Sequence, residues 1–156
     1  MGRLKDLRAI VDQKLLEVED PQKRASATAH LYGVSLAAVL IAKKRGLNEE
    51  LPAMAAMLHD MAAYLSGSYE DHAHRGADLA KEFLNQLNAT SEEETELICS
   101  MIYHHDDKGV VDGEYDEVLK DADVIHHCFH DPSKAVKEKE QKRYDSLVRE
   151  FGLNGD

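Results

Sequence analysis

The sequence predicts an all-α protein, a compact single-domain bundle of about six or seven helices. Apolar residues recur at spacings of three and four through most of the 156 residues, which is the pattern of amphipathic helices. The alternation typical of strands is nowhere sustained, and no internal repeat or low-complexity tract divides the chain. A hydrophobic fraction of 43% is enough for one core, so we expect one domain over residues 1–156.

Proline and cap signals place the helices of the first half. After an amphipathic segment over 4–18, Asp20 and Pro21 are typical of a cap and first turn, and that helix should reach about Arg45. Apolar spacing predicts the next helix over 51–65, before a Ser-Gly-Ser break. The inward face of the helix that starts at Pro21 is expected to include Ala25, Ala29, Tyr32, Leu36, Val39 and Leu40.

The second half continues the helical pattern. A helix is expected over 71–87, and the run over 90–105 opens with a capping Ser or Thr and acids that suit the positive end of a helix dipole. The Asp- and Gly-rich segment 106–114 is the clearest loop, and helical spacing resumes over 115–129. The last of the three prolines should mark the start of a charged amphipathic helix over 133–152.

Charge and cysteine content exclude several classes of protein. Nineteen Lys and Arg against 30 Asp and Glu give a formal net charge of -11, which makes long nucleic acid and anionic membranes poor partners. A small anionic substrate stays open, because a bound cation can dominate the local field. Cys99 and Cys128 form no CxxC pair and predict free thiols in a reducing cytosol. Without a signal-peptide pattern or a run of membrane-spanning length, the sequence favours a cytoplasmic protein.

A histidine and an aspartate interrupt the apolar run AAMLHDMAAY at residues 55–64. These adjacent groups, His59 and Asp60, are costly to bury without partners. A lone histidine on an apolar face is usually a satisfied core residue, but the chain has nine, several of them on successive helices with aspartates beside them. Imidazole and carboxylate together suit one or two divalent ions such as Mn, Fe, Co, Ni or Zn, with Mg for an oxygen-rich part.

The order of these residues resembles the HD-domain superfamily of metal-dependent phosphohydrolases. The resemblance rests on His30 in TAHLYG, the pair His59 and Asp60 in MLHD, and Asp123 in LKDADVI. It implies that these four side chains bind one divalent ion and leave positions open for water and substrate. Asp123 is preferred to Asp121 because the family writes Ala-Asp before an apolar residue, and Asp121 points to a different helix face.

The resemblance also suggests groups for a second ion and for catalysis. His72 in HAHRGA, and His104 and His105 in IYHH, match histidines that hold a second ion or bind phosphate in one branch of the family. That branch includes bacterial diadenosine tetraphosphate hydrolases and, more distantly, cyclic-dinucleotide phosphodiesterases. The alternative is that these histidines are polar pocket walls without a metal. Asp60 would be both a ligand and the carboxylate nearest the attacking water, and His104 or His105 would donate a proton to the leaving oxygen.

Departures from the family pattern leave the substrate open. Ala63 stands where many members carry a lysine, and VIHHCFH follows the late aspartate in place of an acidic or arginine-bearing stretch. Arg75 and Lys108 are the candidates for phosphate contact, because they are the basic residues nearest the ligands in sequence. The histidines of VIHHCFH, His127 among them, either line the substrate pocket or belong to a solvated helix end. The charge run over 134–143 is expected to be a solvated face.

The leading hypothesis is hydrolysis of a phosphate ester or anhydride in a small nucleotide by a metal-activated water. One alternative, motivated by the missing lysine at Ala63, is a metal-stabilised module that binds a nucleotide without turning it over. Another is a di-iron oxygenase on the same scaffold, with His72 and His104 completing the iron ligands. The family-like core covers about residues 24–130, and the amphipathic helices at both ends pack either on this core or on the second subunit of a homodimer.

Overall fold

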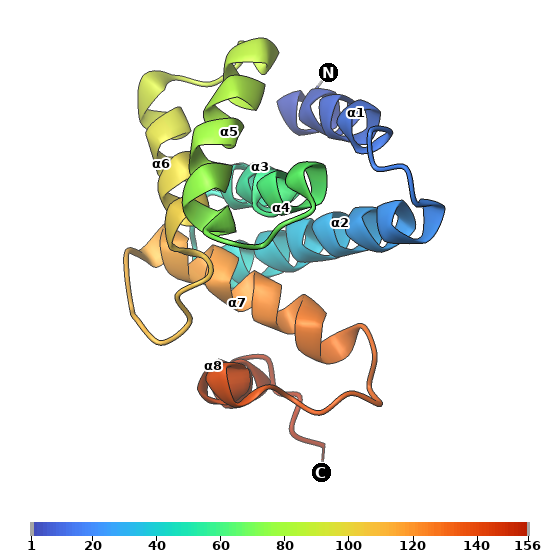
Figure 1. Ribbon diagram of the computed structural model, residues 1–156. Helices are drawn as coiled ribbons and strands as arrows, with labels where there is room; N and C mark the ends of the chain where they lie inside the picture. Colours follow the sequence, from blue (N-terminus) through green and yellow to red (C-terminus); the bar gives the residue numbers. More distant parts are fainter. Residues whose placement is uncertain (1, 156) are drawn as a thin grey trace.

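The computed structural model describes residues 2–155, which fold into eight helices joined by turns and loops (Figure 1). No strand occurs in this range, so the predicted all-α bundle is confirmed. In chain order the helices are α1 (Arg3–Leu15), α2 (Pro21–Lys44), α3 (Glu50–Leu58), α4 (Met61–Ser66), α5 (His72–Leu87), α6 (Glu92–His104), α7 (Glu114–Phe129) and α8 (Glu138–Glu150).

The long helix α2 occupies the centre and packs mainly against α3 and α7, which lie above and below it in Figure 1. Its buried face carries His30, Val34 and Ala38. The predicted inward face was wrong, because Leu36 and Leu40 are 61% and 53% exposed. Apolar residues surround most of this helix, so spacing alone does not choose a face. The face that turns inward is the one that carries the histidine.

Among the described residues, α2 is also the one helix long and apolar enough to cross a membrane by length and composition. This differs from the expectation that no run of membrane-spanning length occurs. Half of the most apolar window of α2 is buried inside the protein, and the core helix of a bundle passes the same test. The position of α2 between α3 and α7 makes it a core helix of this fold.

The apolar run over 51–65 forms two helices instead of one. His59 and Asp60 make a turn between α3 and α4, and the backbone of Asp60 leaves the helical region at φ -109° and ψ 5°. In an unbroken helix, adjacent side chains point about 100° apart. Because the turn interrupts the helix, the side chains of His59 and Asp60 can both face the interior. Gly76 of α5 packs against it so closely that a Cβ there would lie 3.2 Å from the carbonyl oxygen of His59.

The first helix packs on the core of its own chain. Leu7, Val11 and Leu15 are fully buried as α1 lies against α3 and α5. At the start of this helix, the guanidinium of Arg3 donates to both carboxylate oxygens of Glu94 at 2.8 and 2.9 Å. Of the two arrangements expected for this segment, the structure shows the intramolecular one.

The last helix is held on the same core by two arginines. Arg143 of α8 donates to Glu117 at 2.9 Å and to Asp121 at 3.0 Å, both on α7. Arg45, just beyond α2, donates to Asp121 at 2.7 Å and to Glu150 at 2.8 Å. The network therefore joins α2, α7 and α8 through the carboxylate of Asp121.

The prolines mark helix starts at two of the three expected positions. Pro21 and Pro52 lie in the first turns of α2 and α3, but Pro132 lies in the loop before α8, which begins at Glu138. In that loop, Asp131 accepts hydrogen bonds from the amide and the hydroxyl of the serine two residues on. Such local bonds compete with helix formation, so the helix starts later than predicted.

Replacing Asp121 by Asn should lower the free energy of unfolding by about 1–3 kcal/mol, because two part-buried guanidinium groups lose a charged acceptor. Urea denaturation followed by circular dichroism measures this change. The control is Asp145→Asn on the exposed face of α8. Equal stability of the two variants would contradict the role given to the arginine network.

Candidate metal centre

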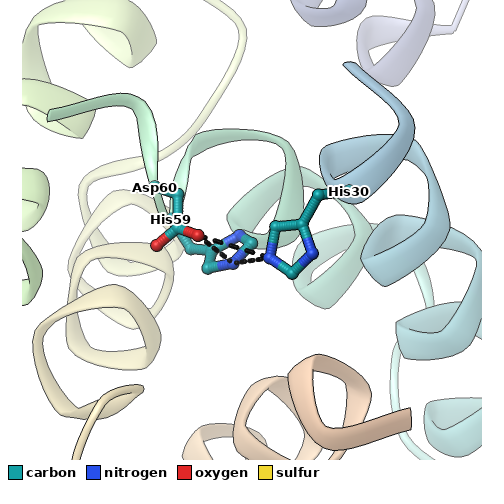
Figure 2. Close-up of side chains that lie close together, drawn as sticks. All are labelled: His30, His59 and Asp60. Carbon is teal, nitrogen blue, oxygen red and sulfur yellow. Dashed lines mark hydrogen bonds and ion pairs between the residues drawn. The ribbon is translucent and has the colours of Figure 1, made fainter. Parts of the chain in front are cut away.

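Six of the seven predicted ligands converge at the centre of the bundle although they come from five different elements. Figure 2 shows three of them, with the turn between α3 and α4 facing α2. All of these side chains are buried, none of them more than 9% exposed. The set comprises His30 of α2, His59 and Asp60 of the turn, His72 of α5, His105 at the end of α6 and Asp123 of α7.

Four donor atoms form a first set around one point. The Nε2 atoms of His30 and His59 are 3.2 Å apart, and each lies between 3.1 and 3.5 Å from both Oδ2 of Asp60 and Oδ1 of Asp123. With metal–ligand bonds of about 2.1 Å, neighbouring ligands are about 3.0 Å apart in octahedral and about 3.4 Å apart in tetrahedral sites. Oδ1 of Asp123 is buried, and no described donor reaches it in hydrogen-bond geometry. These atoms therefore fit a divalent cation.

A second set shares the carboxylate of Asp60. Its other oxygen, Oδ1, lies 3.3 Å from Nε2 of His72 and 3.3 Å from Nε2 of His105. One oxygen of Asp60 therefore faces the first set and the other faces the second. This is the arrangement of a carboxylate that can bridge two ions, as two-metal hydrolytic sites require.

Hydrogen bonds fix which nitrogen of each histidine faces the cluster. His59, His72 and His105 each donate Nδ1–H to a backbone carbonyl three residues earlier, at 2.6, 2.9 and 2.6 Å. With the proton held on Nδ1, the lone pair of Nε2 is left free for a metal. The acceptors, in the same order, are the carbonyl oxygens of Ala56, Tyr69 and Ile102.

The ring of His30 is oriented in the same way, by a hydrogen bond to His126. Their Nδ1 atoms are 2.8 Å apart, and burial together with the nearby charge of His30 lowers the pKa of His126 to about 4. The neutral ring accepts the proton of His30. The ring of His126 lies against Gly33, where a Cβ would overlap its Cδ2 atom. A glycine in mid-helix costs about 1 kcal/mol relative to alanine, and here it makes room for that ring.

The electrostatics of the centre favour a cation. Burial raises the pKa of Asp60, but the charge of His59 and hydrogen bonds from His105 and His30 hold it well below the usual range. Burial opposes protonation of His59, yet Asp60 and Asp123 raise the pKa of this histidine. Without an ion, protonated histidines balance the buried carboxylates. A metal would take the place of those protons.

Neither basic residue expected to contact phosphate faces the cavity. Lys108 is 8% exposed and donates to Oδ2 of Asp123 at 2.8 Å and to the carbonyl of His105 at 2.6 Å. It turns the other oxygen of Asp123 toward the first set. Arg75 donates to three acceptors in the loop 66–70 and braces that loop. Both expectations are corrected, because proximity in sequence did not give proximity to the cavity.

Two pairs of neighbouring candidates are separated by the helix geometry. His105 joins the cluster, whereas His104 is half-buried and its Nδ1 donates to a backbone carbonyl one turn earlier. The expectation that His104 is a ligand or a proton donor is corrected, because adjacent helical residues point about 100° apart. Asp123 lies in the first set, and Asp121 lies in the arginine network described above.

A cavity of about 800 Å³ opens over both donor sets. Ala63, which stands where many members of the family carry a lysine, lines this cavity. Its walls also include His126, His127 and His130, in line with the first of the two alternatives given for the histidines of VIHHCFH. Two tyrosines and three lysines of the wall were not among the predicted site residues. They are Tyr64, Tyr69, Lys23, Lys137 and Lys139. No local signal marks them, because they meet only through the packing of distant elements.

The family model described as HD domain matches residues 28–128, a range that contains every residue of the two donor sets. The chain belongs to the HD domain family. It is also similar to a Bacillus subtilis (strain 168) protein named "Putative phosphohydrolase YueE", with 26% identity over 145 residues that cover 79% of this chain and 82% of that protein. No solved structure matches significantly. The predicted superfamily and the HD-type hydrolase class are thereby confirmed.

Replacing His72 by Gln should reduce the metal content from two ions to one per chain, because only the second set loses a nitrogen ligand. Elemental analysis after reconstitution with Mn(II) or Co(II) measures the content. The matched control is His104→Gln, which removes a histidine outside both sets. Two ions per chain in His72→Gln would contradict this prediction, because the second ion would then be bound somewhere other than the second set.

Proposed function

We propose that this HD-domain protein hydrolyses a phosphate ester or anhydride in a small nucleotide, with one or two divalent ions, in the cytoplasm. The observation that carries the proposal is the carboxylate of Asp60, whose two oxygens face separate donor sets at the floor of one cavity. Family membership and the named relative support the hydrolase class.

The residues of the centre divide the work of such a reaction. When bound, a divalent ion supplies positive charge to the phosphoryl oxygens and lowers the pKa of a water. Asp60 would hold the ions and would be the carboxylate nearest to the attacking water, able to accept its proton. His105 is fully buried, and burial lowers its pKa despite the hydrogen bond to Asp60, so its neutral ring suits a ligand better than a proton donor.

The cavity walls support an anionic substrate with an aromatic ring. Lys23, Lys137 and Lys139 come from the start of α2 and the start of α8, and they place cationic groups at the cavity of a chain with a net charge of -11. They supply the positive charge that Ala63 does not. Tyr64 and the exposed Tyr69 line the cavity, and a base could stack on an aromatic side chain there. Phosphates and a base in one ligand describe a nucleotide.

The two free cysteines support a reducing compartment. Cys99 and Cys128 are both half-buried thiols without a disulfide. Burial raises the pKa of each of them, so neither is an activated nucleophile. They favour the cytoplasm and take no part in the proposed reaction.

A phosphate-release screen over nucleoside phosphates, dinucleoside polyphosphates and cyclic nucleotides tests the proposal. We expect metal-dependent release from one class, and a loss of at least about 10²-fold in Asp60→Asn, because this carboxylate serves both donor sets. Asp121→Asn is the control, since it replaces a buried aspartate outside the centre. Normal turnover in Asp60→Asn would overturn the scheme. Metal binding without release from any class would favour the binding module or the oxygenase.

The double replacement of Lys137 and Lys139 by Ala should raise KM about tenfold with little change in kcat, because the lysines bind substrate away from the reacting bond. Steady-state kinetics on the substrate found in the screen measures both constants. Lys142→Ala, an exposed position on α8 that does not line the cavity, is the control. An unchanged KM in the double variant would remove these lysines from the substrate site.

A further inference from the structure

One side chain of α8 reaches toward the metal centre, although α8 lies outside the region that matches the family model. Glu140, in the first turn of α8, is only 1% exposed, and its Oε2 atom accepts a hydrogen bond from Nδ1 of His127 at 2.9 Å. Burying a carboxylate is unfavourable unless it is paired and hydrogen-bonded. The imidazole of His127 is therefore the group that makes this buried position tolerable.

The other ring nitrogen of His127 faces the first donor set. Its Nε2 lies 3.4 Å from Oδ1 of Asp123, the oxygen that lies 3.1 Å from Nε2 of His30. Donor atoms of His30, Asp123 and His127 all lie within 4.8 Å of one another. The rings of His30 and His127 are nearly parallel, at 10° and 5.1 Å between centroids. His127 thus faces two of the proposed donors of this set, His30 and Asp123.

The hydrogen bonding of His127 is that of a ligand. Its Nδ1 proton is held by an acceptor, so Nε2 has a free lone pair, as in the buried histidines of both donor sets. Here the acceptor is a carboxylate, which also makes the ring a stronger donor to a metal. The next histidine along α7, His130, donates Nδ1–H to the carbonyl of His126 and stacks on that ring instead.

We propose that His127, oriented by Glu140, is a further ligand of the first ion, so that α8 completes the centre. This inference rests on the proposed metal centre. The first ion would then have three nitrogen and two oxygen donors from the protein. Imidazole-rich sets suit Fe, Co, Ni and Zn better than Mg, so the first site should select a transition metal.

The Co(II)-loaded protein tests the inference without any substrate. The visible absorption spectrum reports the number of ligands, and competition with a coloured chelator gives the dissociation constant of the tighter ion. We expect His127→Gln and Glu140→Gln to weaken binding about 10–100-fold and to change the spectrum, because one loses the ligand and the other loses its orientation. His74→Gln, at an exposed histidine of α5 outside the cavity and both donor sets, should match the unaltered protein in both readouts.

The outcomes separate this inference from the proposed function. Affinity and spectrum unchanged in both variants, with Co(II) bound, would overturn the role of His127 and leave the metal centre intact. Failure of the unaltered protein to bind Co(II), Mn(II) or Zn(II) would overturn the centre and this inference together. If His127→Gln does not fold, as judged by circular dichroism, the isosteric Glu140→Gln variant still decides.

Discussion

Two buried carboxylates, Asp60 and Asp123, both lie against Nε2 of His30 in the bundle core, and their negative charge must be balanced by positive charge. Histidines from four helices and one turn gather around them. The turn between α3 and α4 exists where His59 and Asp60 must both face inward. Gly76 lets α5 approach that turn, and α2 turns its histidine-bearing face toward the same point in preference to an equally apolar one.

Hydrogen bonds from the surrounding residues hold the donor atoms in fixed orientations. Backbone carbonyls fix the ring orientation of His59, His72 and His105, and Lys108 fixes that of Asp123. His126 does the same for His30, in a gap left by a glycine. A metal site needs such support, because ligands left to rotate would not keep the required geometry.

The sequence motifs predicted which side chains would come together at the centre, whereas positions that depend on packing could not be predicted. The order of His30, His59, Asp60 and Asp123 is local to short helical motifs, so these positions could be named in advance. The inward face of α2 could not, because its apolar residues run all round the helix. Lys108 was expected to contact phosphate because it is near the ligands in sequence, but it pairs with the ligand Asp123 instead. Glu140 lies in a run of charged residues, and the sequence of such a run does not show which of its side chains is buried.

Crystals of the protein grown with Mn(II), and measured for anomalous scattering, test the central claim most directly. The account predicts one peak among His30, His59, Asp60 and Asp123, and a second peak among Asp60, His72 and His105, with the carboxylate of Asp60 between them. Ordered crystals with no peak beside Asp60, or with peaks only at surface carboxylates, would contradict it. In that case the buried carboxylates would be balanced by protonated histidines alone.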